Sequence, residues 1–314
     1  MKMKQTRTFT LKKVALAMMI AAGTLTSAYA VMTGNTGPII GLAPVLSSPA
    51  TNSAHSVDFS SSTPDGLVTG SVVTMTYSYK DSDGDLDDSI RTVQWFYVPG
   101  NGTGTPVAIA SSGSKATTAD GTTMGTDVIT IPDAALGGVL KVVVTETSIS
   151  GDPIQGRTIT YNNIALQGNS VDPANPGVEV PTEGTPGPTG PDNTKPGIIE
   201  PGAEVKPGIY LSSDTAFANN LIGAPATKLN VGETYVFKLF GADGTTDLTS
   251  TVNYNWRVTG TSATTGTAAP AGGFVTSTTD ANYVIPTNAD GKALTGSDDG
   301  VQGFTLAVDY NAKP

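Results

Sequence analysis

The chain has 314 residues, no cysteine, and 17 basic against 27 acidic side chains, which gives a formal net charge of −10. An acidic surface repels phosphate backbones and anionic lipid head groups, so the charge argues against nucleic-acid binding and peripheral membrane binding. The absence of cysteine excludes disulfides, thiol catalysis, cysteine-ligated zinc and a lipid-modified amino-terminal cysteine.

Residues 1–30 have the pattern of a secretory signal peptide. Five cations and no acid precede or flank an apolar run over 14–25, and Ala28-Tyr29-Ala30 forms a cleavage site before Val31. The apolar run is shorter than the roughly 20 residues that span a bilayer. We therefore expect secretion through the periplasm, no membrane insertion after signal removal, and release or retention at the outer cell surface. Without the five cations, 12 basic side chains face 27 acidic ones, a formal charge near −15.

Residues 31–52 are rich in Gly, Pro and Ser, which predicts an extended tail with an edge strand near Ile39 and Ile40. A first module then follows over 53–168. Short β-branched and aromatic runs between turn residues favour strands. The predicted strands are 57–60, 71–79, 92–98, 107–110, 127–131, 140–146 and 158–164. This pattern is typical of an immunoglobulin-like sandwich, with an up-and-down barrel or a jelly roll as alternatives.

Residues 169–208 contain nine prolines among Gly, Thr and acidic residues. Proline lacks a backbone donor and fixes φ, so we expect a stiff, extended linker. At about 3.1 Å per residue, such a linker could hold two modules on the order of 100 Å apart.

The second module is predicted over 209–314. Its expected strands are 209–212, 227–230, 234–240, 252–258, 282–285 and 303–310. No segment after the signal has a convincing amphipathic helical pattern. The sequence therefore predicts an all-β protein with two immunoglobulin-like β-sandwich domains joined by a Pro/Gly-rich linker.

The two modules share a pattern centred on a tryptophan. Trp95 lies 18 residues after Tyr77, and Trp256 lies 21 residues after Tyr235. An Ile-Pro pair and another alternating strand follow each tryptophan. Alternation places each indole on the apolar face of its strand. We expect two core side chains, in preference to a sugar-stacking platform.

One cluster of carboxylates could bind a metal ion. Asp81, Asp83 and Asp85 occupy alternate positions of an acidic turn, and several Asp oxygens in one turn can chelate calcium. The turn departs from the EF-hand pattern, which requires Gly at Leu86 and Glu at Thr92. A solvated Asp/Gly loop between two strands is therefore the favoured interpretation, and these three residues are the alternative calcium candidates.

Catalytic chemistry finds little support in the sequence. His55 is the lone histidine, and it lies among Ser and Asn, which predicts a solvated surface side chain. Serines are plentiful, but no Gly-x-Ser-x-Gly nucleophile motif is present. We expect no enzyme activity, no catalytic residues and no cofactor.

Several strand-core segments resemble immunoglobulin-like domains of intimin and invasin adhesins. They are Tyr77-Ser-Tyr-Lys-Asp-Ser-Asp-Gly-Asp, Val93-Gln-Trp-Phe-Tyr, Ile131-Pro132 and Gly138-Val-Leu-Lys-Val-Val-Val-Thr-Glu. The plan of signal, module, Pro/Gly-rich linker and second module resembles the SinI-type autotransporter-associated proteins, the ZirS- and ZirU-like group. This resemblance implies a secreted partner of an intimin-like outer-membrane barrel, with a role in host interaction and adhesion. It assigns no binding residue to a position in this chain.

We therefore expect a non-enzymatic exported protein that acts at the bacterial surface or outside the cell. Its expected partners are an intimin-like outer-membrane barrel protein and a host surface protein or glycan. A module of this type can contact its partner by adding a strand at an exposed sheet edge. The alternative is a carbohydrate-binding or calcium-dependent adhesive module.

Overall fold

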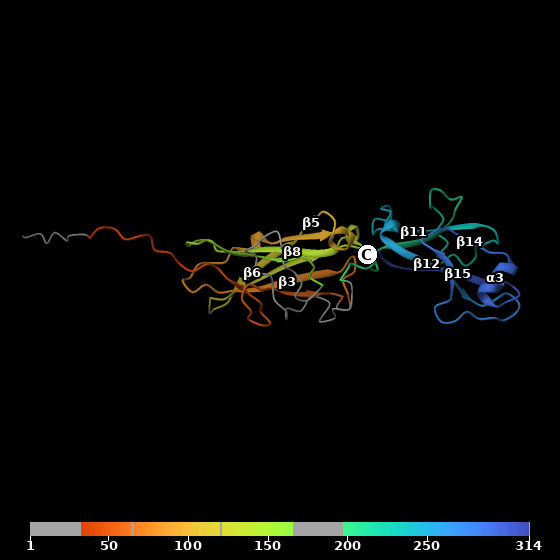
Figure 1. Ribbon diagram of the computed structural model, residues 1–314, viewed down its shortest axis with the longest axis horizontal. Coiled ribbons are helices and arrows are strands. Elements are labelled where there is room, and N and C mark those ends of the chain that lie inside the picture. Colours follow the sequence, from red (N-terminus) through yellow and green to blue (C-terminus); the bar gives the residue numbers. More distant parts are fainter. Residues whose placement is uncertain (1–32, 64–65, 120, 166–196, 314) are drawn as a thin grey trace, which may run out of the picture. The chain divides into compact units, whose positions relative to one another are not determined.

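The computed structural model describes residues 33–63, 66–119, 121–165 and 197–313 (Figure 1). The predicted signal peptide and its cleavage site between Ala30 and Val31 lie outside these residues. The described chain consists mainly of antiparallel strands in four separate sheets, two in each module. This arrangement confirms the predicted all-β sandwich fold. None of the helices in the described ranges is long and apolar enough to cross a bilayer.

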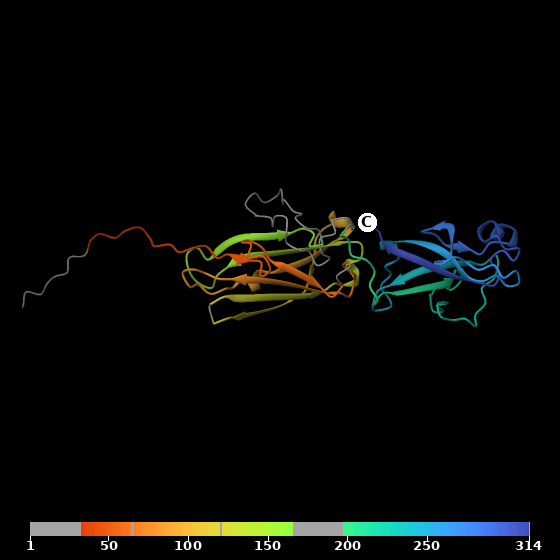
Figure 2. The same ribbon diagram turned by 90° about the horizontal axis from the view of Figure 1, so that it is seen from below.

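The first module consists of two sheets. In the first sheet β1 and β2 pair with β3, and β7 pairs with β3 and β6. The second sheet has the order β5-β4-β8-β9. Figure 1 shows β3 and β6 in one layer and β5 and β8 in the other, and Figure 2 shows the same strands after a 90° turn. The bounds are β1 Leu46–Ser47, β2 Asp58–Ser61, β3 Val72–Tyr79, β4 Gln94–Val98, β5 Val107–Ile109, β6 Ser112–Thr117, β7 Thr123–Thr130, β8 Val139–Thr147 and β9 Gln155–Tyr161.

Period-two alternation produces the core of the first module. In β3 every second side chain, from Val73 to Tyr79, is buried, and β8 buries Val142 and Val144 in the same way. Apolar burial of this kind stabilises the sandwich by about 25 cal/mol for each Å² removed from water. Trp95 lies in this core, with its ring edge-on to Phe59 at a centroid distance of 6.0 Å.

The second module also has two sheets, with the orders β10-β11-β14 and β13-β12-β15. Strand β12 pairs with β15 over its whole length, from Val252 opposite Ala312 to Gly260 opposite Phe304. Trp256 is fully buried in the second core and stacks on Tyr283 at a centroid distance of 5.6 Å. The bounds are β10 Lys206–Leu211, β11 Thr234–Phe240, β12 Val252–Gly260, β13 Phe274–Thr279, β14 Tyr283–Val284 and β15 Phe304–Ala312.

Three short one-turn segments precede strands or connect them. They are η1 Ser89–Thr92, η2 Asp133–Ala135 and η3 Thr249–Thr251. A further segment labelled α2, Pro99–Gly102, is a tight turn, because Gly100 and Asn101 have left-handed backbone angles. Ala135 of η2 is buried in the first core, and Ile90 of η1 packs against it.

Several expectations about the elements are wrong. The edge strand expected near Ile39 and Ile40 is absent, both side chains are exposed, and the first strand is β1 at Leu46–Ser47. Residues 227–230 form no strand. Strands β6 and β13 were not predicted, since their sequences are rich in Ser, Thr, Gly or Lys and lack a clear apolar face.

A true helix, α3, spans Asn288–Thr295, where no helix was expected. The Thr287 hydroxyl accepts a hydrogen bond from the Asp290 N–H, and Gly296 ends the helix with a φ of 72°. These are the start and stop signals of a short helix. Its central residues include Gly291 and Lys292 without a broad apolar stripe, which is why periodicity did not reveal it.

The predicted Pro-rich linker over 169–208 falls outside the described residues up to Pro196. The described residues before 166 and after 196 both bond to the chain at the start of β8. The Ile164 N–H donates to the Leu140 carbonyl at 3.0 Å, and the Ile199 N–H donates to the Gly138 carbonyl at 2.8 Å. Ile199 is thus part of the first core, and only 201–205 separate Glu200 from β10. The predicted bounds of the linker thus include Ile199 of the first core and the start of β10, and the linker over 169–196 stays a prediction.

Candidate functional site

The acidic turn between β3 and η1 brings together the three residues proposed as calcium candidates. One carboxylate oxygen from each of Asp81, Asp83 and Asp85 lies within 4.8 Å of the other two. Within the described ranges, this is the one group of three or more His, Cys, Asp or Glu side chains with such spacing. The structure therefore brings together the three residues that alternate along this turn, and their role as calcium ligands stays a prediction.

Backbone and side-chain donors hold these carboxylates in place. Asp81 Oδ1 accepts the N–H groups of Asp83 and Gly84, at 2.9 and 3.1 Å, in an Asx turn. Asp83 Oδ2 accepts the Leu42 N–H at 2.8 Å, and Asp85 Oδ1 accepts the Ser150 hydroxyl at 2.6 Å. The turn is therefore fixed by chain segments on both sides of it.

The electrostatics of the turn favour an ionised Asp83. Its hydrogen bond with the Asp81 carboxyl, followed by the Leu42 N–H, lowers the pKa of Asp83 below the usual range. A hard cation such as calcium takes several oxygen ligands, including carboxylates placed this close together. The arrangement can thus present several carboxylate oxygens to one divalent cation.

Asp87 belongs to the same acidic run in sequence but not to the exposed cluster. It is 1% exposed, and its Oδ2 accepts the Tyr77 hydroxyl at 2.8 Å. Burial, and then the negative charge of Asp87, raise the pKa of Tyr77 far above its ordinary value. The phenol therefore stays protonated and donates to the carboxylate. Asp87 anchors the acidic turn to the core and does not join Asp83 as a ligand.

The expectation of a solvated His55 is wrong. Its Nδ1 lies 2.9 Å from Glu146 Oε1 and 3.0 Å from Oε2, and the Glu146 side chain is completely buried. The backbone N–H groups of Leu46 and Arg157 also donate to this carboxylate, at 2.8 and 2.9 Å. His55 therefore serves as a structural partner of a buried acid.

Both tryptophans are core residues, as the alternation predicted. Trp95 is 1% exposed and its Nε1 donates to Asp127 Oδ2 at 3.0 Å. Trp256 is fully buried and its Nε1 donates to the Ala281 carbonyl at 2.7 Å. The alternative role of either indole as a sugar-stacking platform is therefore wrong.

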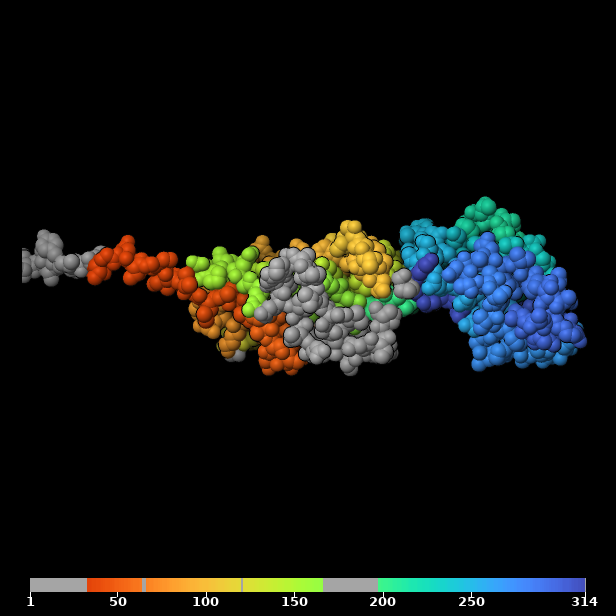
Figure 3. All heavy atoms as spheres, in the orientation of Figure 1, coloured from red at the N-terminus to blue at the C-terminus, as the bar shows by residue number. Residues whose placement is uncertain are grey.

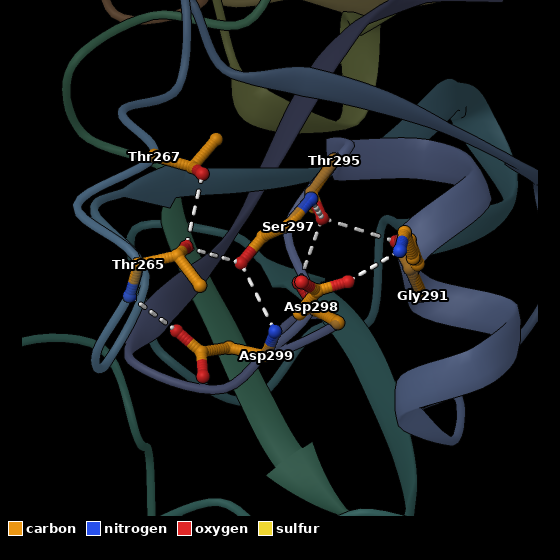
Figure 4. Close-up of polar contacts among 9 residues, drawn as sticks. Thr265, Thr267, Gly291, Thr295, Ser297, Asp298 and Asp299 are labelled. Atoms are coloured by element: carbon orange, nitrogen blue, oxygen red, sulfur yellow. Dashed lines mark hydrogen bonds and ion pairs between the residues drawn. The ribbon is translucent and has the colours of Figure 1, made fainter.

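A cluster of hydroxyl and carboxyl groups connects the C-terminal end of α3 to the 262–267 loop (Figure 4). Ser297 Oγ lies 2.6 Å from Thr265 Oγ1 and accepts the Asp299 N–H at 3.1 Å. Asp299 in turn accepts the Thr265 N–H at 2.9 Å. The Thr264 hydroxyl, followed by backbone N–H groups of the loop, lowers the pKa of Asp299. The network holds the 262–267 loop in place, and the hydroxyl groups of the network make structural hydrogen bonds.

The comparisons with known proteins leave the family open. No protein-family model matches the chain, and no curated protein matches it significantly.

Proposed function

We propose that the chain is a non-enzymatic, exported protein that acts outside the cell by contacting another protein through an edge of one of its β-sandwiches. The observation that supports this proposal is the exposure of β6. All six residues of β6 are exposed, and among the described strands β6 pairs only with β7. Its free side offers backbone donors and acceptors to an added strand.

The hydrogen-bond alternation identifies which β6 groups face outward. The Thr118 N–H donates to the Thr122 carbonyl at the hairpin end of this ladder. In an antiparallel pair the bonded positions alternate, so Ala116 and Ser114 face β7 while the N–H groups of Thr117, Lys115 and Gly113 face away from it. A partner strand would bind to this second set.

An intimin-like outer-membrane barrel is the proposed partner. The signal pattern of residues 1–30 supports export, and the strand-core segments around Tyr77 and Val93 resemble domains of intimin-like adhesins. A chain without cysteine forms no disulfide that would oppose threading through a pore. A host surface protein or glycan is the proposed target after export.

Replacing Thr117 with proline should weaken capture by the barrel. Proline removes the outward N–H and is tolerated at a strand edge, so we expect at least about fivefold weaker binding. The matched control is Thr117→Val, which keeps the N–H and removes the hydroxyl. Binding is measured by pull-down of the full chain with intimin-like barrels encoded in the same genome. Equal capture of the proline and valine variants would exclude β6 as the contact. If the barrels do not capture the unaltered chain and the chain stays strictly in the periplasm, the proposed partner is wrong.

A calcium-dependent adhesive module is the second candidate function, and the convergence of Asp81, Asp83 and Asp85 favours it. Calorimetric titration of the full chain with calcium should then give a saturable isotherm. Asp83→Ala and Asp85→Ala should each weaken binding by about tenfold or more, because each removes a charged oxygen ligand. Asp298→Ala, which removes an exposed carboxylate in the second module, is the control. An isotherm unchanged by the first two substitutions would eliminate the acidic turn as the site.

A further inference from the structure

The outer face of the β10–β11 ribbon carries aromatic side chains where a solvent-facing sheet usually carries polar ones. Ile209 and Phe237 point into the core, so alternation places Tyr210 and Phe240 on the opposite face. The loop after β10 brings Phe217 to the same face and forms part of the surface of the second module, in green in Figure 3. These three rings lie outside the main core cluster of the second module.

The rings form one compact group. Tyr210 packs edge-on to Phe217 at a centroid distance of 5.3 Å and to Phe240 at 6.5 Å, and Phe217 lies 6.4 Å from Phe240. Tyr210 lies over Gly208, where a Cβ atom would come within 2.4 Å of the ring. The glycine therefore creates the space that the tyrosine ring occupies.

Phe217 has an unfavourable backbone conformation that holds its ring at this position. Its φ is 50°, in the left-handed region that glycine adopts readily and bulky side chains avoid. Lys238 Nζ lies 4.9 Å from the centre of the Phe217 ring, and it also pairs with Asp247 at 2.6 Å. Backbone strain of this kind is concentrated at binding and active sites.

Next to the rings lies a pocket of about 480 Å³, within the usual size range of small-molecule sites. Its lining includes Lys206, Tyr210, Phe217 and Phe240. Tyr210 is only 5% exposed, and neither its hydroxyl nor the Lys206 ammonium makes a hydrogen bond with any residue that the structure describes. Burial, and then the charge of Asp214, raise the pKa of Tyr210, which keeps the phenol as a donor. Two polar groups are thus available to a ligand.

The groups around the pocket limit the chemical class of ligand that it can bind. A peptide strand cannot add to β10, because its outward groups are already bonded: Asn220 Oδ1 accepts the Ile209 N–H, Asn220 Nδ2 donates to the Pro207 carbonyl, and the Leu221 N–H donates to the Ile209 carbonyl. Lys206 and Lys238 disfavour a cationic ligand in the aromatic group. A flat ring with apolar C–H faces and hydroxyls at its rim fits both the aromatic rings and the free polar groups.

We propose that this pocket binds a pyranose ring of a glycan, with the sugar face packed on Phe217 and Phe240 and its hydroxyls bonded to Lys206 and Tyr210. The site lies wholly in the second module and uses neither the β6 edge nor the acidic turn. Failure of sugar binding would therefore leave the proposed protein contact unaffected, and loss of barrel capture would leave this site unaffected.

The test is saturation-transfer NMR on the full chain with the methyl glycosides of glucose, galactose, mannose and N-acetylglucosamine, followed by a glycan array. At least one glycoside should bind at millimolar concentration. Phe217→Gly keeps the left-handed backbone without strain and removes the ring, and Phe240→Ala removes the second ring. Each should weaken binding by about tenfold or more.

Phe274→Ala is the matched control, because Phe274 is a half-buried ring in the same module that packs on Phe304 instead. It should bind sugar as the unaltered chain does. Absence of binding to every glycoside and array glycan would overturn the proposal. So would binding that persists in both pocket variants, or a pocket that takes up a free aromatic amino acid and no sugar.

Discussion

Replacing Glu146 with glutamine is expected to lower the free energy of unfolding of the first module by about 3 kcal/mol. Each carboxylate oxygen of this fully buried side chain accepts a backbone N–H, from Leu46 or Arg157, and both lie within hydrogen-bond distance of His55 Nδ1. The amide nitrogen of glutamine would have to replace one of these oxygens and would face a donor instead of accepting from it. One buried backbone N–H would then lose its acceptor.

Amide hydrogen exchange of the full chain, followed by mass spectrometry, measures this loss in the peptides of β8 and β9 separately from the second module. The matched control is Glu233→Gln, an exposed glutamate of the second module, which should change stability by no more than about 0.5 kcal/mol. If the amides of β8 and β9 exchange as slowly in the Glu146 variant as in the unaltered chain, the Glu146 carboxylate does not stabilise the first module.

The His55–Glu146 pair illustrates what the sequence could not reveal. The two residues are 91 positions apart, and His55 adopts a left-handed φ of 56° that brings its ring to the acid. Alternation indicates which face of a strand a side chain occupies. It does not indicate which polar group lies opposite on another segment, so the only histidine was expected in solvent.

The strands with strict alternation were predicted well. Strands β3, β8, β11 and β12 all fall within two residues of their expected bounds. Strand β6 was missed because its residues are all exposed, so no apolar face marks it. Strand β13 and the helix α3 were missed for a related reason: short peripheral elements are defined by pairing and capping more than by hydrophobic period.

The two candidate sites also differ in how far the sequence could predict them. The carboxylates of the acidic turn lie at alternate positions within five residues, so their convergence follows from a single tight turn. The aromatic pocket is built from Tyr210 on one strand, Phe217 on a strained loop and Phe240 on the next strand. No fixed spacing connects such residues. The one local signal was an aromatic residue at an outward position, since Phe240 continues the alternation of β11 on the polar side.

Replacing Trp95 with phenylalanine should destabilise its module more than the same substitution at Trp256 destabilises the second module. Both variants lose part of a fully buried ring, and each loses one hydrogen bond of the indole N–H. The Trp256 bond goes to a neutral carbonyl, for which a total loss of about 2 kcal/mol is expected. The Trp95 bond goes to the Asp127 carboxylate, which is 1% exposed, so we expect about 3 kcal/mol or more.

A double-mutant cycle with Asp127→Asn separates the charge from the lost ring volume. Asparagine is nearly isosteric with aspartate and is neutral. When Phe replaces Trp95, a buried amide without the indole N–H therefore destabilises the module less than a buried carboxylate without it. The combined variant should therefore be more stable than the sum of the single losses predicts, with a coupling of about 1 kcal/mol, measured by hydrogen exchange in β4 and β7. Strict additivity would mean that Asp127 finds another donor or water when the indole is removed. The cost of Trp95→Phe would then resemble that of Trp256→Phe, with no added penalty for an orphaned carboxylate.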